Sequence, residues 1–381
     1  MRAYVMPEAG RLELTTVADP ACAADEIVLE TEAVSVCSTD VSHFRGHLRP
    51  ESWPVVPGHE YVGRVVEIGA ALTGRVRLGD RLSYWGQTDF GGLAEFRALC
   101  PLFPGGPDGS DGANGETRWH TPRNFYDADQ AAAVTVPPGL DPGRATLAEP
   151  LTSVLRSLLA NPPAPGDTVV LLGCGPSALL ALQVLLRCMA VGRVVALDRD
   201  PARLRLARAL GAETVFDVVG QADDLERFLA EHGDSFADYA LDALPHIETP
   251  EGCRDARQAA MALLRPGGTY VIYGATAVPQ PVHTWLILAK GLRVQASAFD
   301  VRLFPMWRTA HVARVALGLI ERGIVDVAPL LTGHVDFADE PAVRSVFTRY
   351  GEGGALKTSI GFGGGPTGAV GMAGAVLAGA G

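Results

Sequence analysis

Short apolar runs separated by turn residues fill the first 100 positions. The runs cover residues 27–32, 61–68, 79–82 and 91–96. Gly, Pro and Asp bound most of them, and this spacing is typical of strands in a compact all-β unit. The pattern therefore predicts a β domain in the first part of the chain.

From residue 167 the pattern changes to apolar strands that alternate with helices rich in Ala, Leu and Arg. Strands are expected at 168–172, 194–197, 239–241 and 269–273, and helices at 177–190 and 201–210. Alternation of this kind predicts a parallel sheet with helices on both faces. The predicted fold class is therefore α/β, in which a doubly wound parallel sheet follows the β unit.

Two segments interrupt these patterns. Residues 101–130 are rich in Gly, Pro and Asp, and a loop of that length in a compact domain is either functional or disordered. Its larger side chains either contact substrate or pack the loop down: Trp119, His120, Arg123 and Tyr126. Residues 363–381 are uncharged, rich in Gly and Ala and without an apolar period, and we expect a flexible tail there.

Composition narrows the class of protein. A chain of 381 residues with 48% hydrophobic and 20% charged residues has room for two soluble domains. The net charge of -11 argues against nucleic acid, because phosphate backbones need clustered Lys and Arg. Six irregularly spaced cysteines without a signal peptide favour a cytoplasmic location. The uncharged run 169–186 contains Gly and Pro, so we interpret it as a β-turn-α unit and expect no membrane segment.

A glycine-rich turn follows the expected strand 168–172. Its six residues fit the G-x-G-x-x-G/A pattern and open a helix, which is the context that a dinucleotide-binding turn requires: Gly173, Cys174, Gly175, Pro176, Ser177 and Ala178. The glycines permit the tight turn and the close approach of a pyrophosphate, and the small last residue lets helix and strand pack closely. The helix N-terminus then offers unpaired N–H groups to the phosphates.

Asp198 ends the next expected strand and supports the same interpretation. A carboxylate at this position hydrogen-bonds the adenosine ribose hydroxyls and repels a 2′-phosphate, which favours NAD over NADP. Arg199 is the adjacent residue that could instead accommodate that phosphate. The alternative is that the glycines only turn the chain and Asp198 caps the following helix.

Metal-binding residue types occur near the start of the chain. Cys37 lies 21 residues before Gly58, which is followed by His59 and Glu60. A thiolate, an imidazole and a carboxylate form the kind of three-ligand set that leaves the fourth zinc position open for catalysis. No Cys-x2-Cys pair of the kind that closes structural zinc sites is present. Taken alone, each residue would more often be an ordinary buried side chain.

The order of three segments resembles the zinc-dependent medium-chain dehydrogenase/reductases of the alcohol dehydrogenase superfamily, above all their sorbitol and threonine dehydrogenase branch. The segments are Cys-x-Thr-Asp at 37–40, Gly-His-Glu at 58–60 and Ala-Glu-Pro-Leu at 148–151, all ahead of the nucleotide turn. The resemblance implies a GroES-like β catalytic domain at 1–150, a Rossmann NAD-binding domain at 151–296, and completion of the catalytic domain by 297–362. It also implies homodimers or homotetramers.

The resemblance also implies roles for single residues. Cys37 and His59 match zinc ligands, and Glu60 and Glu149 match carboxylates that bind the metal directly or through water, a choice that the sequence leaves open. Thr39 matches the hydroxyl residue that hydrogen-bonds the substrate alcohol and starts a proton relay. Hydride would pass from the alcohol carbon to the nicotinamide of NAD while zinc lowers the pKa of the alcohol.

Two departures from the family pattern concern the relay and the number of zinc ions. The family commonly has a histidine five residues after the cysteine; here Ser42 occupies that position and His43 follows it. The sequence therefore leaves the far end of the relay open, with His43 as the candidate. The nine residues between Arg81 and Gly91 contain no cysteine, where the family carries its structural zinc lobe. We therefore expect one catalytic Zn²⁺ per chain and no structural zinc.

The resemblance favours a small-molecule alcohol or ketone substrate, such as a polyol, a cyclitol or an aminocyclitol; a threonine-like amino alcohol and a simple aliphatic alcohol stay open. One rival is a metal-free enoyl or quinone reductase, against which Cys37 and His59 argue. Another is a non-catalytic nucleotide-binding redox sensor, which would bind nicotinamide without turnover.

Overall fold

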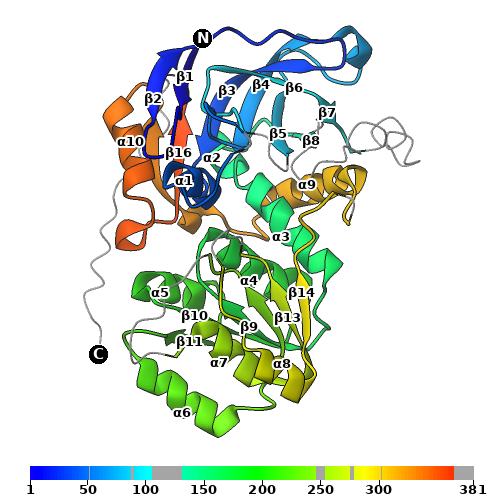
Figure 1. Cartoon of the computed structure of the whole chain (residues 1–381). Helices are drawn as coiled ribbons and strands as arrows, with labels where there is room; N and C mark the ends of the chain where they lie inside the picture. Colours follow the sequence, from blue (N-terminus) through cyan, green and yellow to red (C-terminus); the bar gives the residue numbers. More distant parts are fainter. Residues whose placement is uncertain are drawn as a thin grey trace, which may run out of the picture.

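Two β-sheets organise the protein. The computed structural model describes residues 1–50, 52–86, 90–104, 131–245, 254–274, 279–301 and 303–363. In Figure 1 the larger sheet lies in the upper half of the view and the parallel sheet in the lower half. The predictions for Trp119, His120, Arg123 and Tyr126 and for the tail at 364–381 lie outside the described residues.

The larger sheet has eight strands in the order β15-β16-β3-β4-β5-β8-β7, with β6 also paired to β3. Most of its pairs are antiparallel, whereas β15/β16 and β7/β8 are parallel. Its strands are β3 (Ile27–Ser35), β4 (Glu60–Ile68), β5 (Arg81–Trp85), β6 (Phe96–Leu99), β7 (Pro101–Leu102), β8 (Ala131–Thr135), β15 (Leu331–Asp336) and β16 (Lys357–Gly361). A separate antiparallel pair is formed by β1 (Arg2–Val5) and β2 (Glu13–Thr16).

The second sheet has six parallel strands in the order β11-β10-β9-β12-β13-β14. This is the strand order of doubly wound dinucleotide-binding domains, and it confirms the predicted parallel sheet. The strands are β9 (Thr168–Leu172), β10 (Arg193–Asp198), β11 (Thr214–Asp217), β12 (Ala237–Asp242), β13 (Leu264–Ile272) and β14 (Arg293–Ala296).

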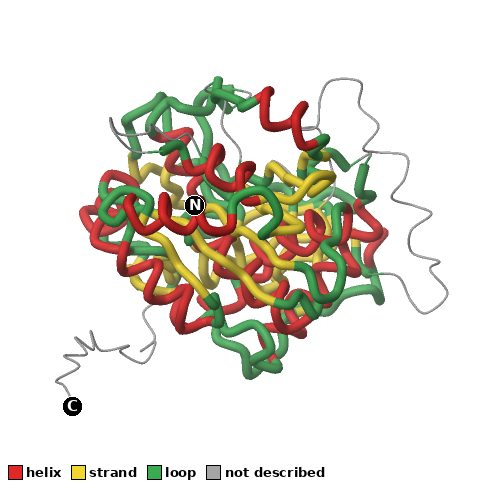
Figure 2. Tube along the Cα trace, turned by 90° about the horizontal axis from the view of Figure 1, so that it is seen from below, coloured by secondary structure: helices red, strands yellow, loops and turns green. Residues whose placement is uncertain are grey.

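Alternate residues of the parallel strands point to two different cores. Val169 and Leu171 join a cluster with α3, α4, α5 and α9, whereas Val170 and Leu172 join a cluster with α6, α7 and α8. Both faces of the sheet are therefore covered, as the period-two pattern of side chains requires. Figure 2 shows the yellow strands between the red helices.

The helices begin and end as follows: α1 (Ser38–Phe44), α2 (Pro142–Ala145), α3 (Ala148–Ala160), α4 (Pro176–Cys188), α5 (Pro201–Leu210), α6 (Ala222–His232), α7 (Ala256–Leu263), α8 (Thr284–Lys290), α9 (Met306–Glu321) and α10 (Glu340–Thr348). In the part of the chain that the structure describes, short 3-10 helices cover Ala70–Leu72, Ala328–Leu330 and Glu352–Gly354. None of the helices among the described residues combines the length and the apolar character needed to cross a membrane.

The C-terminal part of the chain returns to the first sheet. Strand β16 pairs antiparallel with β3, with Ser359 opposite Ser35 and Ile360 opposite Val34. Figure 1 shows these orange and red C-terminal elements beside the blue N-terminal strands. Residues some 320 positions apart in sequence therefore share one sheet. The exact domain boundaries at 150, 296 and 362 stay a prediction.

Two expected strands start several residues away from their predicted positions. The run 91–96 is not a strand throughout, because Gly91 adopts φ +117 and β6 begins only at Phe96. Strand β13 begins at Leu264 rather than at 269, and its register against β12 jumps from Leu264 to Thr269. The turn residues 265–268, with Gly267 at φ +73, are thus looped out of the pairing inside a longer strand.

Candidate metal centre and dinucleotide site

Cys37 occupies the N-terminal cap of α1, directly after the end of β3. Asp40, three residues later, accepts a hydrogen bond from the backbone N–H of Cys37 at 2.9 Å, as in a capping box. Its other oxygen accepts from the N–H of Gly58 at 2.8 Å. One fully buried carboxylate therefore ties the cysteine loop to the Gly-His-Glu segment.

Gly58 is required where these loops meet. It adopts φ +95, and an added Cβ would lie 2.9 Å from Cγ1 of Val34 and 3.0 Å from the backbone N of Leu93. A side chain here would meet both backbone strain and packed neighbours. The tight turn at Gly58 places His59 and Glu60 beside Cys37.

Among the described residues, Cys37, His59 and Glu60 form a group of potential metal ligands whose ligand atoms all lie within 4.8 Å of one another. Nδ1 of His59 lies 3.6 Å from Oδ1 of Asp40 and is buried without a hydrogen-bond partner. Oε2 of Glu60 is buried without a hydrogen-bond partner. A thiol, an imidazole and a carboxylate oxygen without a partner fit a zinc ion.

Lys357, the first residue of β16, is buried against this group. Its Nζ contacts Oε1 of Glu60 and donates to the carbonyl of Val36 at 3.4 Å. The ion pair occupies one carboxylate oxygen and leaves the other free. We did not predict a role for this residue from the sequence. The available signal was that Lys357 is one of only two lysines in the chain and lies among mostly uncharged residues.

Electrostatics favour a charge pair between the thiol and the imidazole. Burial raises the pKa of the Cys37 thiol, but the positive charges of Lys357 and His59 outweigh burial and bring it down to about 6. Burial lowers the pKa of His59, yet Asp40 and Cys37 raise it well above its ordinary value. A divalent cation would bind the thiolate and the neutral imidazole, and it would displace the proton of the imidazolium.

Glu149 lies at the edge of the cluster. It is the second residue of α3, is only 7% exposed, and is not part of the group within 4.8 Å. Burial raises the pKa of its carboxyl to about 7, opposed by the charge of His59 and reinforced by that of Glu60. Whether Glu60 or Glu149 is the third ligand therefore stays open.

Thr39 and His43 lie four residues apart on α1, on one face of the helix. Oγ1 of Thr39 is 3.8 Å from the sulfur of Cys37. His43 is buried, its Nδ1 has no hydrogen-bond partner, and burial lowers its pKa. Phe90 was not anticipated from the sequence; its ring centroid lies 4.9 Å from that of His43 and 5.3 Å from that of His59.

The glycine-rich turn has the expected strand-turn-helix geometry. Gly173 adopts φ +86 at the end of β9, and Gly175 caps α4, with open space where its Cβ would be. Pro176 is the first residue of α4, and Ala178 is buried against the sheet. The arrangement leaves room for a pyrophosphate at the helix N-terminus.

Asp198 lies beside this turn at the end of β10. Its carboxylate accepts hydrogen bonds from the N–H of Cys174 at 2.5 Å and from that of Asp200 at 2.8 Å. The alternative that Asp198 caps the next helix is wrong, because Asp200 caps α5 by accepting from Ala202 and Arg203. Arg199 is exposed.

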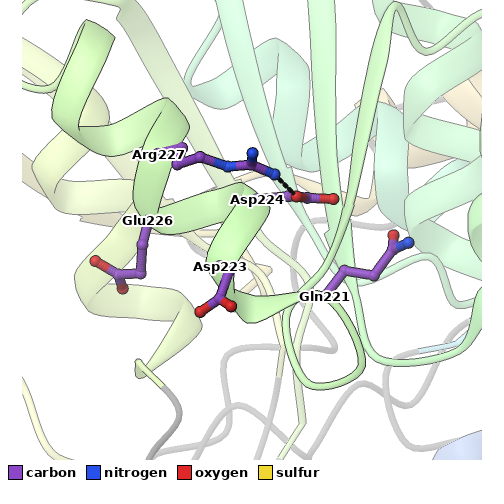
Figure 3. Close-up of a pocket in the computed structure, with 5 residues that line it drawn as sticks. All are labelled: Gln221, Asp223, Asp224, Glu226 and Arg227. Carbon is purple, nitrogen blue, oxygen red and sulfur yellow. Dashed lines mark hydrogen bonds and ion pairs between the residues drawn. The ribbon is translucent and has the colours of Figure 1, made fainter.

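A surface hollow lies elsewhere, at the start of α6. Figure 3 shows the residues that line it: Gln221, Asp223, Asp224, Glu226 and Arg227. Arg227 is paired with Asp224. The helix lies at the lower end of the molecule in Figure 1, far from α1, so this hollow is separate from the metal centre.

Comparison with known proteins gives matches to two families. The alcohol dehydrogenase GroES-like domain matches residues 23–124, and the zinc-binding dehydrogenase family matches residues 178–313. The D-arabitol-phosphate dehydrogenase of Enterococcus avium is 24% identical over 350 residues, which cover 90% of this chain and 91% of that protein. The sorbitol dehydrogenase of Halalkalibacterium halodurans is 27% identical over 269 residues, which cover 69% of this chain and 73% of that protein.

A solved structure of an Escherichia coli alcohol dehydrogenase with NADH superposes with a TM-score of 0.72 at 20% identity, covering 95% of this chain and 99% of the other. Together with the family matches it confirms a GroES-like β part combined with a Rossmann-type sheet. The chain belongs to the zinc-dependent medium-chain dehydrogenase/reductases of the alcohol dehydrogenase superfamily, which are NAD(P)-dependent oxidoreductases acting on alcohols.

Replacement of Cys37 by alanine tests the metal centre. We expect the Cys37→Ala protein to lose its zinc and its turnover, because the thiolate is removed from the ligand group, while NADH still binds at the separate glycine-rich turn. Metal analysis and NADH fluorescence measure the two effects. Cys188→Ala, at an exposed thiol, is the matched control and keeps its zinc. Retention of zinc by the Cys37 variant would contradict the assignment.

Replacement of Lys357 tests the buried ion pair. Lys357→Met leaves the carboxylate of Glu60 buried without its cation, and we expect a loss of about 3–5 kcal/mol in stability. Urea denaturation of chelator-treated protein measures the change. Adding Glu60→Gln removes the uncompensated charge and restores most of the stability. A double variant no more stable than the single one would show that the charge pair is not the cause.

Proposed function

We propose that the protein is a zinc- and NAD-dependent dehydrogenase that interconverts a secondary alcohol of a polyol, cyclitol or aminocyclitol and the matching ketone. The convergence of Cys37, His59 and Glu60 within 4.8 Å of one another carries this proposal. The names of the sorbitol and D-arabitol-phosphate dehydrogenases support a polyol-like substrate.

In this proposal Cys37, His59 and either Glu60 or Glu149 would hold a zinc ion, whose Lewis acidity would lower the pKa of the alcohol hydroxyl. Thr39 lies next to the sulfur of Cys37 and would pass the proton outward, accepting it from the alcohol as it gives up its own. His43, four residues further along α1, receives the proton at the far end of the relay. The lowered pKa of His43 keeps its ring neutral at pH 7 and able to accept it.

Lys357 has a positioning role in the same arrangement. It holds Oε1 of Glu60 and leaves Oε2 without a hydrogen-bond partner beside Cys37 and His59. The positive charge of Lys357 also stabilises the Cys37 thiolate, which is the form that binds metal. Asp40 orients the imidazole of His59 from the other side.

The cofactor proposed is NAD rather than NADP. The Asp198 carboxylate is held beside the glycine-rich turn by the N–H groups of Cys174 and Asp200. Each of its oxygens has a second lone pair for a ribose hydroxyl. Its negative charge disfavours a 2′-phosphate at that position.

A panel of alcohols tests this function. We expect polyols and cyclitols to give the highest kcat/KM when NAD is the acceptor. The reaction is measured as the rise in NADH absorbance, with zinc-replete protein. The panel includes amino alcohols and simple aliphatic alcohols, each with NAD and with NADP. A preference for NADP would contradict the role of Asp198. Zinc-independent reduction of quinones or enones would favour a metal-free reductase. Binding of NADH without any turnover would favour a redox sensor.

A homodimer or homotetramer is proposed as the assembly. All four residues of β14 are exposed at the edge of the parallel sheet, and the adjacent α8 exposes Trp285 and Leu288 at 73% and 75%. The outer side of an edge strand has unpaired main-chain N–H and C=O groups. In a second copy related by a two-fold axis the same strand runs antiparallel to the first, so the two edge strands can pair with each other.

Light scattering tests this assembly. We expect the wild type at two or more times the chain mass of 40.1 kDa. We expect Leu288→Glu to shift the protein toward the monomer, because the new charge would be buried in the interface with the second copy of the chain. Leu78→Glu, at a side chain that is 67% exposed outside the parallel sheet, is the control and leaves the mass unchanged. A monomeric wild type would contradict the proposal.

A further inference from the structure

Asp242 is the last residue of β12, and its side chain is buried at the carboxyl end of the parallel sheet. Oδ2 accepts hydrogen bonds from Nε of Arg257 at 2.7 Å and from the hydroxyl of Tyr270 at 2.8 Å. Oδ1 accepts from the backbone N–H of Leu244 at 3.0 Å. Arg257 is the second residue of α7 and is also buried. The charge of the carboxylate is therefore balanced from α7 while the carboxylate fixes the chain just beyond β12.

The guanidinium of Arg257 joins three segments of the chain. Through Nη2 it donates to the backbone carbonyls of Leu244 at 3.2 Å and Pro245 at 3.0 Å. Through Nη1 it donates to Oε1 of Gln280, in the chain that follows β13, at 2.9 Å. The planar fork of arginine makes several directed hydrogen bonds at once, whereas a lysine ammonium is a compact point charge. One buried side chain thus ties together the end of β12, the residues after it and the chain after β13.

Residues 243–245, here called the β12 loop, pack against the dinucleotide turn. The N–H of Ala243 donates to the carbonyl of the last residue of β9 at 3.0 Å. Cδ2 of Leu244 lies 3.1 Å from the point where a Cβ on Gly173 would be. On the other side, Gly274 approaches so closely that its Cβ would lie 1.9 Å from the carbonyl oxygen of Leu244. The β12 loop is therefore wedged between the ends of β9 and β13.

The β12 loop lies where the strand order of the sheet reverses. The order β11-β10-β9-β12-β13-β14 reverses between β9 and β12, and sheets of this type bind dinucleotides across the crevice at that point. In the proposed cofactor site, Asp198 at the end of β10 takes the adenosine on one side of the dinucleotide turn. The half of the cofactor beyond the pyrophosphate then falls on the other side, toward the β12 loop.

We propose that Arg257 is a positioning residue for the cofactor. It acts from α7, which covers the face of the sheet opposite to α4, and it fixes the β12 loop in advance for the half of NAD beyond the pyrophosphate. A loop that is already fixed does not have to be ordered when the ligand binds, and this preserves affinity. The guanidinium itself acts only through the loop. The inference rests on the proposed dehydrogenase function.

The alternative is that Arg257 only stabilises the fold. A buried ion pair is often no more stabilising than apolar side chains of similar volume. Balancing the charge of Asp242 would require only a cation beside it, whereas Arg257 directs its other hydrogen bonds to the segments that follow β12 and β13. The two roles differ in whether ligand binding depends on these bonds.

Two ligands of different length separate the two roles without relying on turnover. NADH spans the crevice, whereas AMP ends at the dinucleotide turn. Dissociation constants for both are measured by calorimetry for the wild type, for Arg257→Lys and for the double variant Arg257→Met with Asp242→Asn. Arg257→Lys keeps a cation beside Asp242 but loses the fork, and the double variant removes both charges. Neither protein therefore carries a buried charge without a partner.

Lys290→Met is the matched control. The side chains of Lys290 and Arg257 are equally buried, each being 9% exposed. The ammonium of Lys290 also donates to backbone carbonyls of the same domain, those of Ala262 and Leu264, but these lie at the amino end of β13, away from the crevice. Loss of this buried cation therefore tests the effect of a general loss of stability.

For Arg257→Lys we expect NADH to bind about ten-fold more weakly, which is the cost of ordering about one backbone residue on binding. We expect AMP to bind as in the wild type. The double variant shows the same pattern, because it also lacks the fork. Lys290→Met changes neither constant.

Hydrogen exchange of the β12 loop, measured by mass spectrometry, adds a direct readout of its order. In ligand-free Arg257→Lys we expect the amides of residues 243–245 to exchange faster than in the wild type, because the loop opens locally. Saturating NADH restores their protection.

Unchanged NADH binding in Arg257→Lys, or an equal loss for NADH and AMP, would overturn the inference. Weaker NADH binding with wild-type protection of the β12 loop, or a similar loss in Lys290→Met, would also overturn it. A wild type that binds neither NADH nor AMP would contradict the proposed function itself, so the two failures are distinguishable.

Discussion

The need to compensate a cluster of buried charges governs the structure around the metal centre. Glu60 and Lys357 are almost fully enclosed, and a buried charge without a partner is far more costly than a paired one. Lys357 can reach Glu60 only if β16 pairs with β3, so the ion pair and the closure of the first sheet depend on each other. Asp40 performs the same task on the other side by joining the Cys37 loop to Gly58.

This arrangement links the fold to the proposed chemistry. Three potential ligands from two loops converge because a sheet end, a helix cap and a left-handed glycine each fix one of them. Glu149 enters from α3, whose other side packs on α4 of the Rossmann unit. The metal centre therefore lies where the β part meets the dinucleotide sheet.

The sequence predicted the local elements better than the contacts between distant ones. Strand β9 and helix α5 have the predicted bounds, because an apolar run and a Pro-to-Gly helix are local signals. The grouping of Cys37, His59 and Glu60 was expected from their residue types and their family-like order. Lys357 lies 297 residues from Glu60, and no local pattern indicates that pairing. The start of β13 was misplaced because Gly267 suggests a turn, whereas the strand continues around it.

The central claim is that one zinc ion binds between the Cys37 thiolate and the His59 imidazole. Anomalous diffraction at the zinc edge, from crystals of protein purified without chelator, tests it most directly. We expect one strong peak per chain, about 2.3 Å from the sulfur of Cys37 and about 2.0–2.1 Å from a ring nitrogen of His59. No peak after addition of zinc, or a peak bonded to neither residue, would contradict the account.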